Sequence, residues 1–302
     1  MACRVMHCPL MTCIAVVAMQ DVVCASSTAG AELVAFVGKG DGSFAPGVAS
    51  SGLPVQAFVI ASGSFNPVYM GGQGQVAGYS VAADGVATLI NSQSTQESII
   101  AIILDASEDW LLSASFGNSI ESHGINQATG VIGPRVHFVS ATTSGMGPGG
   151  LVMAPDNSRL VAASPAAGRV ALFDFNSTTG VMSSSVQDFP AGALPRGVVV
   201  FASAVGNADF RFTYAVPGAG GNTLTLLLGD GAGPKLSYFT FFFGDGREVP
   251  CYRPSAIAAA DLDSDGDMDL VVGCQGDSGD EQHHLFVLLN RGGLITFSIS
   301  QL

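Results

Sequence analysis

Charged side chains, and lysine above all, are scarce in this sequence. Only 12% of the 302 residues are charged, Lys39 and Lys235 are the only lysines, and the formal net charge is −13. A globular domain ordinarily has about 25% charged residues. Proteins that bind a phosphate backbone gather basic residues into patches, whereas the nine arginines here are scattered from Arg4 to Arg291. We therefore expect no nucleic acid partner, and the acidic balance favours cations.

Long apolar runs are missing as well. The longest near the N-terminus, residues 11–19, is shorter than a bilayer requires, so we expect no membrane span. Residues 1–25 allow two interpretations. They resemble a signal peptide, with Arg4 ahead of an apolar stretch and a cleavage site before Ser26, which implies an extracellular, secreted protein. They also fit a degenerate first inner strand of a repeated fold.

Motifs for nucleophilic catalysis and for phosphate binding are absent too. The sequence contains no Gly-x-Ser-x-Gly and no Gly-x-x-x-x-Gly-Lys-Ser/Thr. The glycine-rich residues 145–150 are not followed by a helical pattern, so we interpret them as a connector and not as a phosphate cradle. No catalytic residue follows from motifs alone.

Glycine, in contrast, is abundant and recurs at regular intervals. Six tight turns end in a glycine, and the intervals between these glycines are 43, 45, 50, 51 and 62 residues. Apolar segments of period two flank the turns, which is typical of β-strands. A repeat of about fifty residues is the length of a four-stranded antiparallel unit such as a propeller blade. The six turn glycines are Gly42, Gly85, Gly130, Gly180, Gly231 and Gly293.

The predicted fold is therefore all-β, a β-propeller of about six, possibly seven, four-stranded antiparallel blades. We expect residues 26–302 to form a single propeller domain. The predicted blades cover residues 9–52, 53–97, 98–147, 148–193, 194–252 and 253–302.

The second to fourth units resemble a known propeller family. They contain VAGYSVAADG from Val76, APDNSRLVAAS from Ala154 and VALFDFNSTTG from Val170. These strands and turns are similar to the lactonase-like seven-bladed propellers of the 6-phosphogluconolactonase type. The resemblance implies a propeller and, as one alternative, hydrolysis of a sugar lactone, but the matching residues include no catalytic group of the family.

The first, fifth and sixth units resemble FG-GAP (VCBS-type) repeats, the blades of the integrin α-chain propeller. The segments that show this resemblance are GKGDGSFAP from Gly38, LLGDG from Leu227 and DLDSDGDMDL from Asp261. The last stretch is similar to the calcium loop D-x-D-x-D-G-x-x-D of that family. The resemblance implies a calcium-binding extracellular module for binding or adhesion, whose protein or carbohydrate ligand the residues do not specify.

The aspartate spacing supports Ca²⁺ on chemical grounds. Calcium takes about six to eight oxygen ligands, and carboxylates at alternate positions of a tight loop can converge on one point. We expect side chains of Asp261, Asp263, Asp265 and Asp269 and the backbone carbonyl of Asp267 to bind it. An EF-hand is excluded because Val272 stands at its twelfth position, where a glutamate is required.

Two related loops are expected to bind no ion. In the fifth unit, residues 203–211 have lost most of the carboxylates, and Arg211 would place a cation there. In the first unit only Asp21 remains, with Cys13 at the first ligand position.

We interpret the remaining candidate residues as structural, except for one site whose modification depends on secretion. Cys251 and Cys274 form either a disulfide pair or two buried thiols. Asn176 begins an Asn-x-Ser/Thr sequon, a glycosylation site if the protein is secreted. His283 and His284 are adjacent, and because neighbouring strand residues point to opposite faces we expect no shared metal. We interpret His123, His137 and Trp110 as ordinary strand residues, and expect a partner or another domain to cover residues 239–243.

The leading hypothesis is a calcium-binding extracellular propeller module. The first alternative is a lactonase-like enzyme with a polar site at one end of the propeller, for which Arg196, Glu248 and Arg253 are the candidates. The second alternative is a structural fragment of a larger multi-propeller protein.

Overall fold

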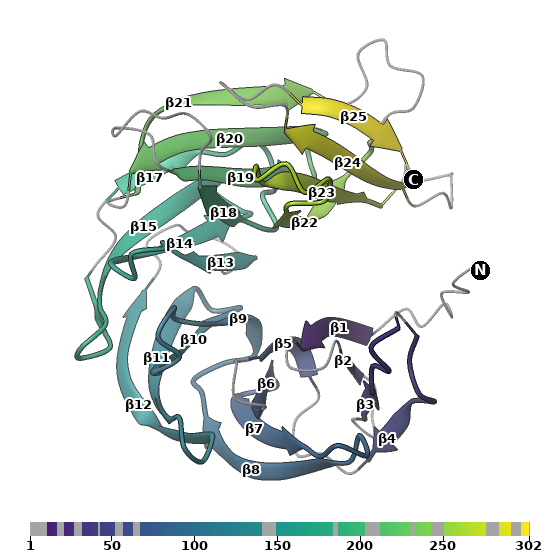
Figure 1. Ribbon diagram of the computed structural model, residues 1–302. Helices are drawn as coiled ribbons and strands as arrows, with labels where there is room; N and C mark the ends of the chain where they lie inside the picture. The colour runs from purple at the N-terminus through teal and green to yellow at the C-terminus, as the bar shows by residue number, and fades with distance from the viewer. Residues whose placement is uncertain are drawn as a thin grey trace. The chain divides into compact units, whose positions relative to one another are not determined.

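The structure is a computed structural model, and its described residues form β-strands joined by turns (Figure 1). Within these residues there are 25 strands and no helix, and accordingly no helix of the length and apolarity that crossing a membrane requires. The described residues are 11–16, 21–26, 32–41, 43–51, 57–62, 67–140, 149–183, 187–202, 212–230, 233–242, 251–275, 284–290 and 297–301.

The first three sheets each contain four antiparallel strands in chain order. Sheet one has β1 (Met11–Val16), β2 (Asp21–Ser26), β3 (Leu33–Phe36) and β4 (Val48–Ser50). Sheet two has β5 (Ala57–Ser62), β6 (Pro67–Gly72), β7 (Gln75–Val81) and β8 (Ala87–Ser94). Sheet three has β9 (Ile99–Leu104), β10 (Trp110–Ser115), β11 (Ser119–Asn126) and β12 (Val131–Ser140).

The last three sheets repeat this order. Sheet four has β13 (Gly150–Met153), β14 (Arg159–Ser164) and β15 (Arg169–Asn176), whose outer edge pairs with both β16 (Val181–Met182) and β17 (Gln187–Pro190). Sheet five has β18 (Val199–Ala202), β19 (Phe212–Gly218), β20 (Thr223–Asp230) and β21 (Gly233–Phe242). Sheet six has β22 (Pro254–Ala260), β23 (Asp269–Cys274), β24 (His284–Asn290) and β25 (Phe297–Gln301).

These sheets are the blades of a propeller fold, as the repeat predicts. Each of the six falls within one of the six predicted units. The chain divides into two compact units, with sheets one to three mainly in the first and sheets four to six in the second. Within each unit the first strand of one sheet contacts the first strand of the next: β1 contacts β5 and β5 contacts β9, and likewise β13, β18 and β22. The first strands are therefore the innermost ones.

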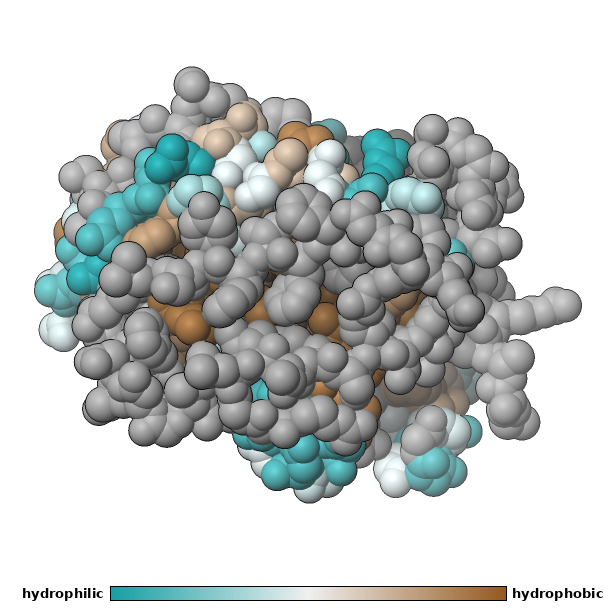
Figure 2. Space-filling view, turned by 90° about the horizontal axis from the view of Figure 1, so that it is seen from above, coloured by the Kyte–Doolittle hydropathy of each residue, from teal (hydrophilic) through white to brown (hydrophobic). Residues whose placement is uncertain are grey.

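The hydrophobic core lies between neighbouring sheets. Ile99 and Leu111 of sheet three pack with Tyr69 and Val76 of sheet two, and similar clusters join sheets four and five and sheets five and six. Burial of apolar area at these seams is the main force that holds successive blades together. In the face shown in Figure 2, hydrophilic side chains gather into groups, and apolar side chains are also visible.

The turn glycines have the backbone conformation that the sequence predicts at three described positions. The φ angles are +85° at Gly85, +71° at Gly130 and +70° at Gly180. Only glycine adopts this left-handed region without strain, so these residues fix the hairpins between the third and fourth strands. At Gly130 a Cβ atom would also lie 2.8 Å from Ile90 Cδ1 and 3.1 Å from Pro67 Cβ, so a larger residue there would require its neighbours to shift as well.

Candidate functional site

The two ends of the sheets differ in their polar side chains: one carries the aspartate loop and the other carries arginines. In an antiparallel sheet of chain order, the first-to-second and third-to-fourth turns lie at one end, and the other connections lie at the opposite end. The aspartate loop 261–268 joins β22 to β23 and belongs to the first end. Arg196 and Arg253 precede the innermost strands β18 and β22 and belong to the opposite end, which we call the arginine end.

The aspartate loop brings three of the predicted ligands together. Asp261, Asp263 and Asp265 each offer a carboxylate oxygen, these atoms lie within 4.8 Å of one another, and all three side chains are exposed. The loop bends through left-handed residues, with φ +61° at Ser264 and +94° at Gly266. Clustered hard oxygen donors of this kind fit a divalent cation such as Ca²⁺.

Backbone hydrogen bonds hold these carboxylates in place. Asp261 Oδ1 accepts from Asp265 N at 3.2 Å and its Oδ2 from Gly266 N at 3.1 Å, while Asp265 Oδ1 accepts from Asp267 N at 2.9 Å. An Asp–Gly turn of this type aligns the side chains before any ion binds. The loop is therefore preorganised by its own backbone.

Asp269, the fourth predicted side-chain ligand, is buried and stands apart from this cluster. Its Oδ2 accepts from Leu262 N at 2.8 Å and its Oδ1 from Asn290 N at 2.7 Å. The side chain of Asp269, on β23, thus connects the start of the loop with the end of β24 and has a structural role. Any role as a ligand would use the remaining lone pairs of these oxygens.

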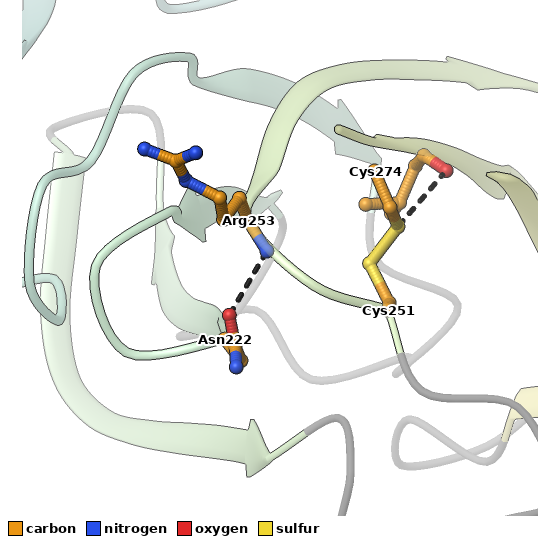
Figure 3. The surroundings of a disulfide bond; sticks show 5 residues. Asn222, Cys251, Arg253 and Cys274 are labelled. Carbon is orange, nitrogen blue, oxygen red and sulfur yellow. Dashed lines mark hydrogen bonds between the residues drawn. A yellow bond between two sulfur atoms is a disulfide. The ribbon is translucent and has the colours of Figure 1, made fainter. Parts of the chain in front are cut away.

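At the arginine end, two predicted residues flank one turn of sheet five. Arg253 N donates to Asn222 Oδ1 at 2.9 Å, and the guanidinium points away from the nearby disulfide (Figure 3). The connector that carries Arg196 also contacts this turn, since Ala219 N donates to Leu194 O at 3.1 Å. Both arginines are exposed.

At the arginine end, close backbone contacts of glycines also involve sheet four. A Cβ atom at Gly150 would lie 2.9 Å from Gly197 Cα, and one at Gly168 would lie 2.9 Å from Gly192 O, so bare backbone is needed at both contacts. Next to Gly168 stands a third exposed arginine, Arg169. Within the described residues, none of these three arginines forms an ion pair.

The disulfide Cys251–Cys274 lies beside Arg253 (Figure 3). It resolves the two possibilities that the sequence leaves open: the cysteines are paired, with Cα atoms 5.4 Å apart. The bond ties the connector before β22 to the end of β23, and both residues are buried. It therefore anchors the segment that carries Arg253. Cys24 is also disulfide-bonded.

A buried polar cluster at the seam of sheets two and three escaped the sequence analysis. Glu121 on β11 is 1% exposed, and its Oε1 lies 3.1 Å from Arg135 Nη1 of β12. Gln96 N donates to the same oxygen at 3.1 Å, and His123 Nε2 lies 3.6 Å from Oε2. His123 does lie on a strand, β11, as predicted, but it is not isolated, because Glu121 is two positions away on the same face of that strand.

The pKa of Glu121 lies below its ordinary value. Burial alone would raise it, but the interactions with His123, Gln96 N and the Arg135 charge together outweigh that effect. The carboxylate is therefore ionised at neutral pH and fixes the connector between the two sheets.

The other sequence candidates have these places. Asn176 is exposed and its Oδ1 accepts from Thr178 N at 3.0 Å and Thr179 N at 3.1 Å, an Asx turn. His284 makes an edge contact with Phe286, with ring centroids 6.4 Å apart, and Trp110 is half-buried. Residues 203–211, His283 and Glu248 lie outside the described residues, as do the side chains at positions 239–243.

The comparisons with known proteins agree with one of the two resemblances. Residues 59–202, just under half the chain, match the family described as lactonase, seven-bladed beta-propeller. None of the curated proteins matches the sequence. The lactonase-like part of the sequence prediction is thus supported, and the FG-GAP part stays a prediction. Within the described residues the chain forms six sheets, against seven blades in that family.

Solved structures confirm the propeller fold. A candidate 6-phosphogluconolactonase from Bacteroides fragilis is 13% identical with a TM-score of 0.69, covering 94% of this chain and 82% of that one. One from Bacteroides uniformis is 14% identical with a TM-score of 0.66, covering 97% and 82%. A protein from Lactobacillus plantarum is 16% identical with a TM-score of 0.66, covering 95% and 86%. At such identities the likeness concerns the fold alone.

Proposed function

We propose that the protein is a propeller hydrolase that opens a sugar lactone at the arginine end. The observation that carries this proposal is the match of residues 59–202 to the lactonase family. The innermost strands supply no charged group, since β9, β13, β18 and β22 contain none. The loops at one end of the strands must therefore bind a polar ligand, and ligand sites are commonly located there.

Hydrolysis of a lactone requires a group that stabilises negative charge on the carbonyl oxygen. Water adds to the lactone carbonyl, the ring C–O bond breaks, and the product is a hydroxy acid that releases a proton at neutral pH. The carbonyl oxygen carries the developing charge, and aligned donors at that position are the main source of acceleration in acyl transfer. Guanidinium groups of Arg196 and Arg253 are permanently charged donors suited to that role.

Hydrolysis of D-glucono-δ-lactone by the purified protein, followed as proton release at constant pH, tests the proposal. We expect a rate that exceeds spontaneous opening, is saturable in lactone and is proportional to protein concentration. Heat-denatured protein is the control. A rate equal to the spontaneous one, with this lactone and with a γ-lactone, would remove the hydrolase proposal.

A second proposal concerns the aspartate loop, which we propose binds Ca²⁺ and stabilises sheet six. The convergence of Asp261, Asp263 and Asp265 favours it. At a concentration 100 times the Kd, a ligand of the native state adds about 2.7 kcal/mol to its stability. The Cys251–Cys274 bond supports an oxidising, extracellular location, where such a module would work.

Removal of calcium should lower the melting temperature. We expect the midpoint of unfolding to fall by about 5 °C or more when EDTA replaces millimolar Ca²⁺, and the D263N/D265N variant to show no such shift. The exposed Asp188 on β17 supplies the control, since D188N should respond as the wild type does. An equal midpoint with EDTA and with Ca²⁺ would rule out the calcium site.

A further inference from the structure

Three residues at the arginine end share an unusual backbone conformation. Leu194, Asn222 and Arg253 have φ angles of +52°, +49° and +53°, a region that is unfavourable for residues with a Cβ atom, although asparagine tolerates it. In the described part of the chain the other non-glycine residues with positive φ are Glu108, Asn118, Asn157 and Ser264, each between two paired strands of one sheet. Leu194 and Arg253 instead lie in connectors between sheets. Such a conformation persists only where surrounding contacts hold it.

Contacts on both sides hold the backbone of Arg253. Its N–H donates to Asn222 Oδ1 at 2.9 Å, and its carbonyl oxygen accepts from Gln275 N at 3.4 Å. The Cys251–Cys274 disulfide joins the two segments that carry Arg253 and Gln275 (Figure 3). The guanidinium, in contrast, is exposed, points away from the disulfide and forms no ion pair with the described residues. The backbone is therefore fixed, while the side chain is left open to a ligand.

The hairpin between β19 and β20 also contacts the connector of Arg196, there through backbone hydrogen bonds. Arg196 N donates to Pro217 O at 3.3 Å. A bond between two backbone groups does not depend on which side chains are present. The N–H of Arg253 differs, because it is bound by the side chain of Asn222. Of the two arginines, Arg253 is therefore the one whose backbone depends on the side chain of another residue.

We propose that Asn222 is a positioning residue for Arg253 in lactone hydrolysis, an inference that rests on the function proposed above. Its Oδ1 keeps Arg253 in the left-handed conformation, and the guanidinium thereby keeps the direction shown in Figure 3. Without this acceptor the backbone of Arg253 would return to a more favourable region of φ, and its guanidinium would move. A small displacement of a group that stabilises the developing charge is enough to slow the reaction substantially.

Replacement of Asn222 by glycine tests this role. N222G loses the acceptor without added strain, because glycine adopts positive φ freely. We expect kcat/KM for D-glucono-δ-lactone to fall about five- to twentyfold, mainly in kcat, because the contact serves the transition state. N222D keeps an oxygen for the N–H of Arg253 and should stay within about threefold of the wild type.

The matched control is N157G, at the end of sheet four that lies opposite the arginine end. Asn157 also has a left-handed backbone, with φ +61°, and its Oδ1 accepts from Ala106 N at 3.1 Å. N157G removes the same kind of contact, so it should lower the melting temperature without changing kcat or KM. All rates are measured at a temperature at which far-UV circular dichroism shows each variant to be folded.

Double variants distinguish positioning from a general loss of structure. Because Asn222 acts through Arg253, N222G should have no further effect on kcat/KM in R253A, yet should still lower it in R196A. A wild-type rate in N222G, an N222D variant as slow as N222G, or an equal further loss in R253A would overturn the positioning role while lactone hydrolysis stood. A wild-type protein that does not hydrolyse the lactone would overturn both proposals.

Discussion

The E121Q substitution is expected to lower the free energy of unfolding by about 2–4 kcal/mol at pH 7. Glutamine keeps an oxygen for Gln96 N but removes the negative charge that Arg135 and His123 face. Loss of one member of a fully buried ion pair typically costs about 3–5 kcal/mol. The expected loss is smaller because Arg135 is 35% exposed and water partly replaces its partner.

The sign of the pH dependence follows from the lowered pKa of Glu121. A carboxyl group with a depressed pKa in the folded state contributes stability that is fully present above its unfolded pKa and is lost as the pH falls through the folded value. Urea unfolding of wild type and E121Q should therefore differ most above the ordinary carboxyl pKa of 4.5, and the two curves should converge at lower pH.

The matched control is E97Q, which removes an exposed carboxylate from the connector that Glu121 contacts through Gln96. It should change stability by less than about 0.5 kcal/mol. The double variant E121Q/R135Q should lose less than the sum of its single variants, because the two residues interact directly. Additive losses, or an E121Q midpoint that tracks the wild type at every pH, would contradict the role given to this cluster.

The fold was predictable because its determinants are local. Alternating apolar residues and turn glycines such as Gly85 and Gly130 act on a few neighbouring positions, and the same fifty-residue pattern recurs along the chain. The aspartate loop is also one continuous segment, so its convergence at Asp261, Asp263 and Asp265 could be expected from spacing alone.

The remaining polar sites combine residues that are distant in sequence. Glu121 meets Arg135 from the next strand and Gln96 from the preceding connector, and nothing in the alternating pattern distinguishes a buried glutamate from an exposed one. The available signal was the pair Glu121 and His123, two polar residues on the same face of a strand.

The second large expected effect is a loss of lactone hydrolysis when arginines at the arginine end are replaced, and its size should depend on the position of each arginine. We expect R196A and R253A each to lower kcat/KM for lactone hydrolysis about 30- to 100-fold, because a charge-assisted hydrogen bond contributes about 1.5–3 kcal/mol. These two residues precede the innermost strands β18 and β22. Arg169 begins β15, two strands farther out, so R169A should change the rate less than threefold.

Two further variants test whether the guanidinium itself matters. Lysine keeps the charge but not the planar pair of donors, so R196K should recover only part of the rate lost in R196A. R159A removes an arginine whose Nε lies 3.2 Å from Asp174 Oδ1, at the opposite end of sheet four, and should leave kcat and KM unchanged. If an active protein kept its rate in both R196A and R253A, the lactone would have to bind elsewhere; if R169A had the largest effect, the ligand would lie between the outer strands and not beside the innermost ones.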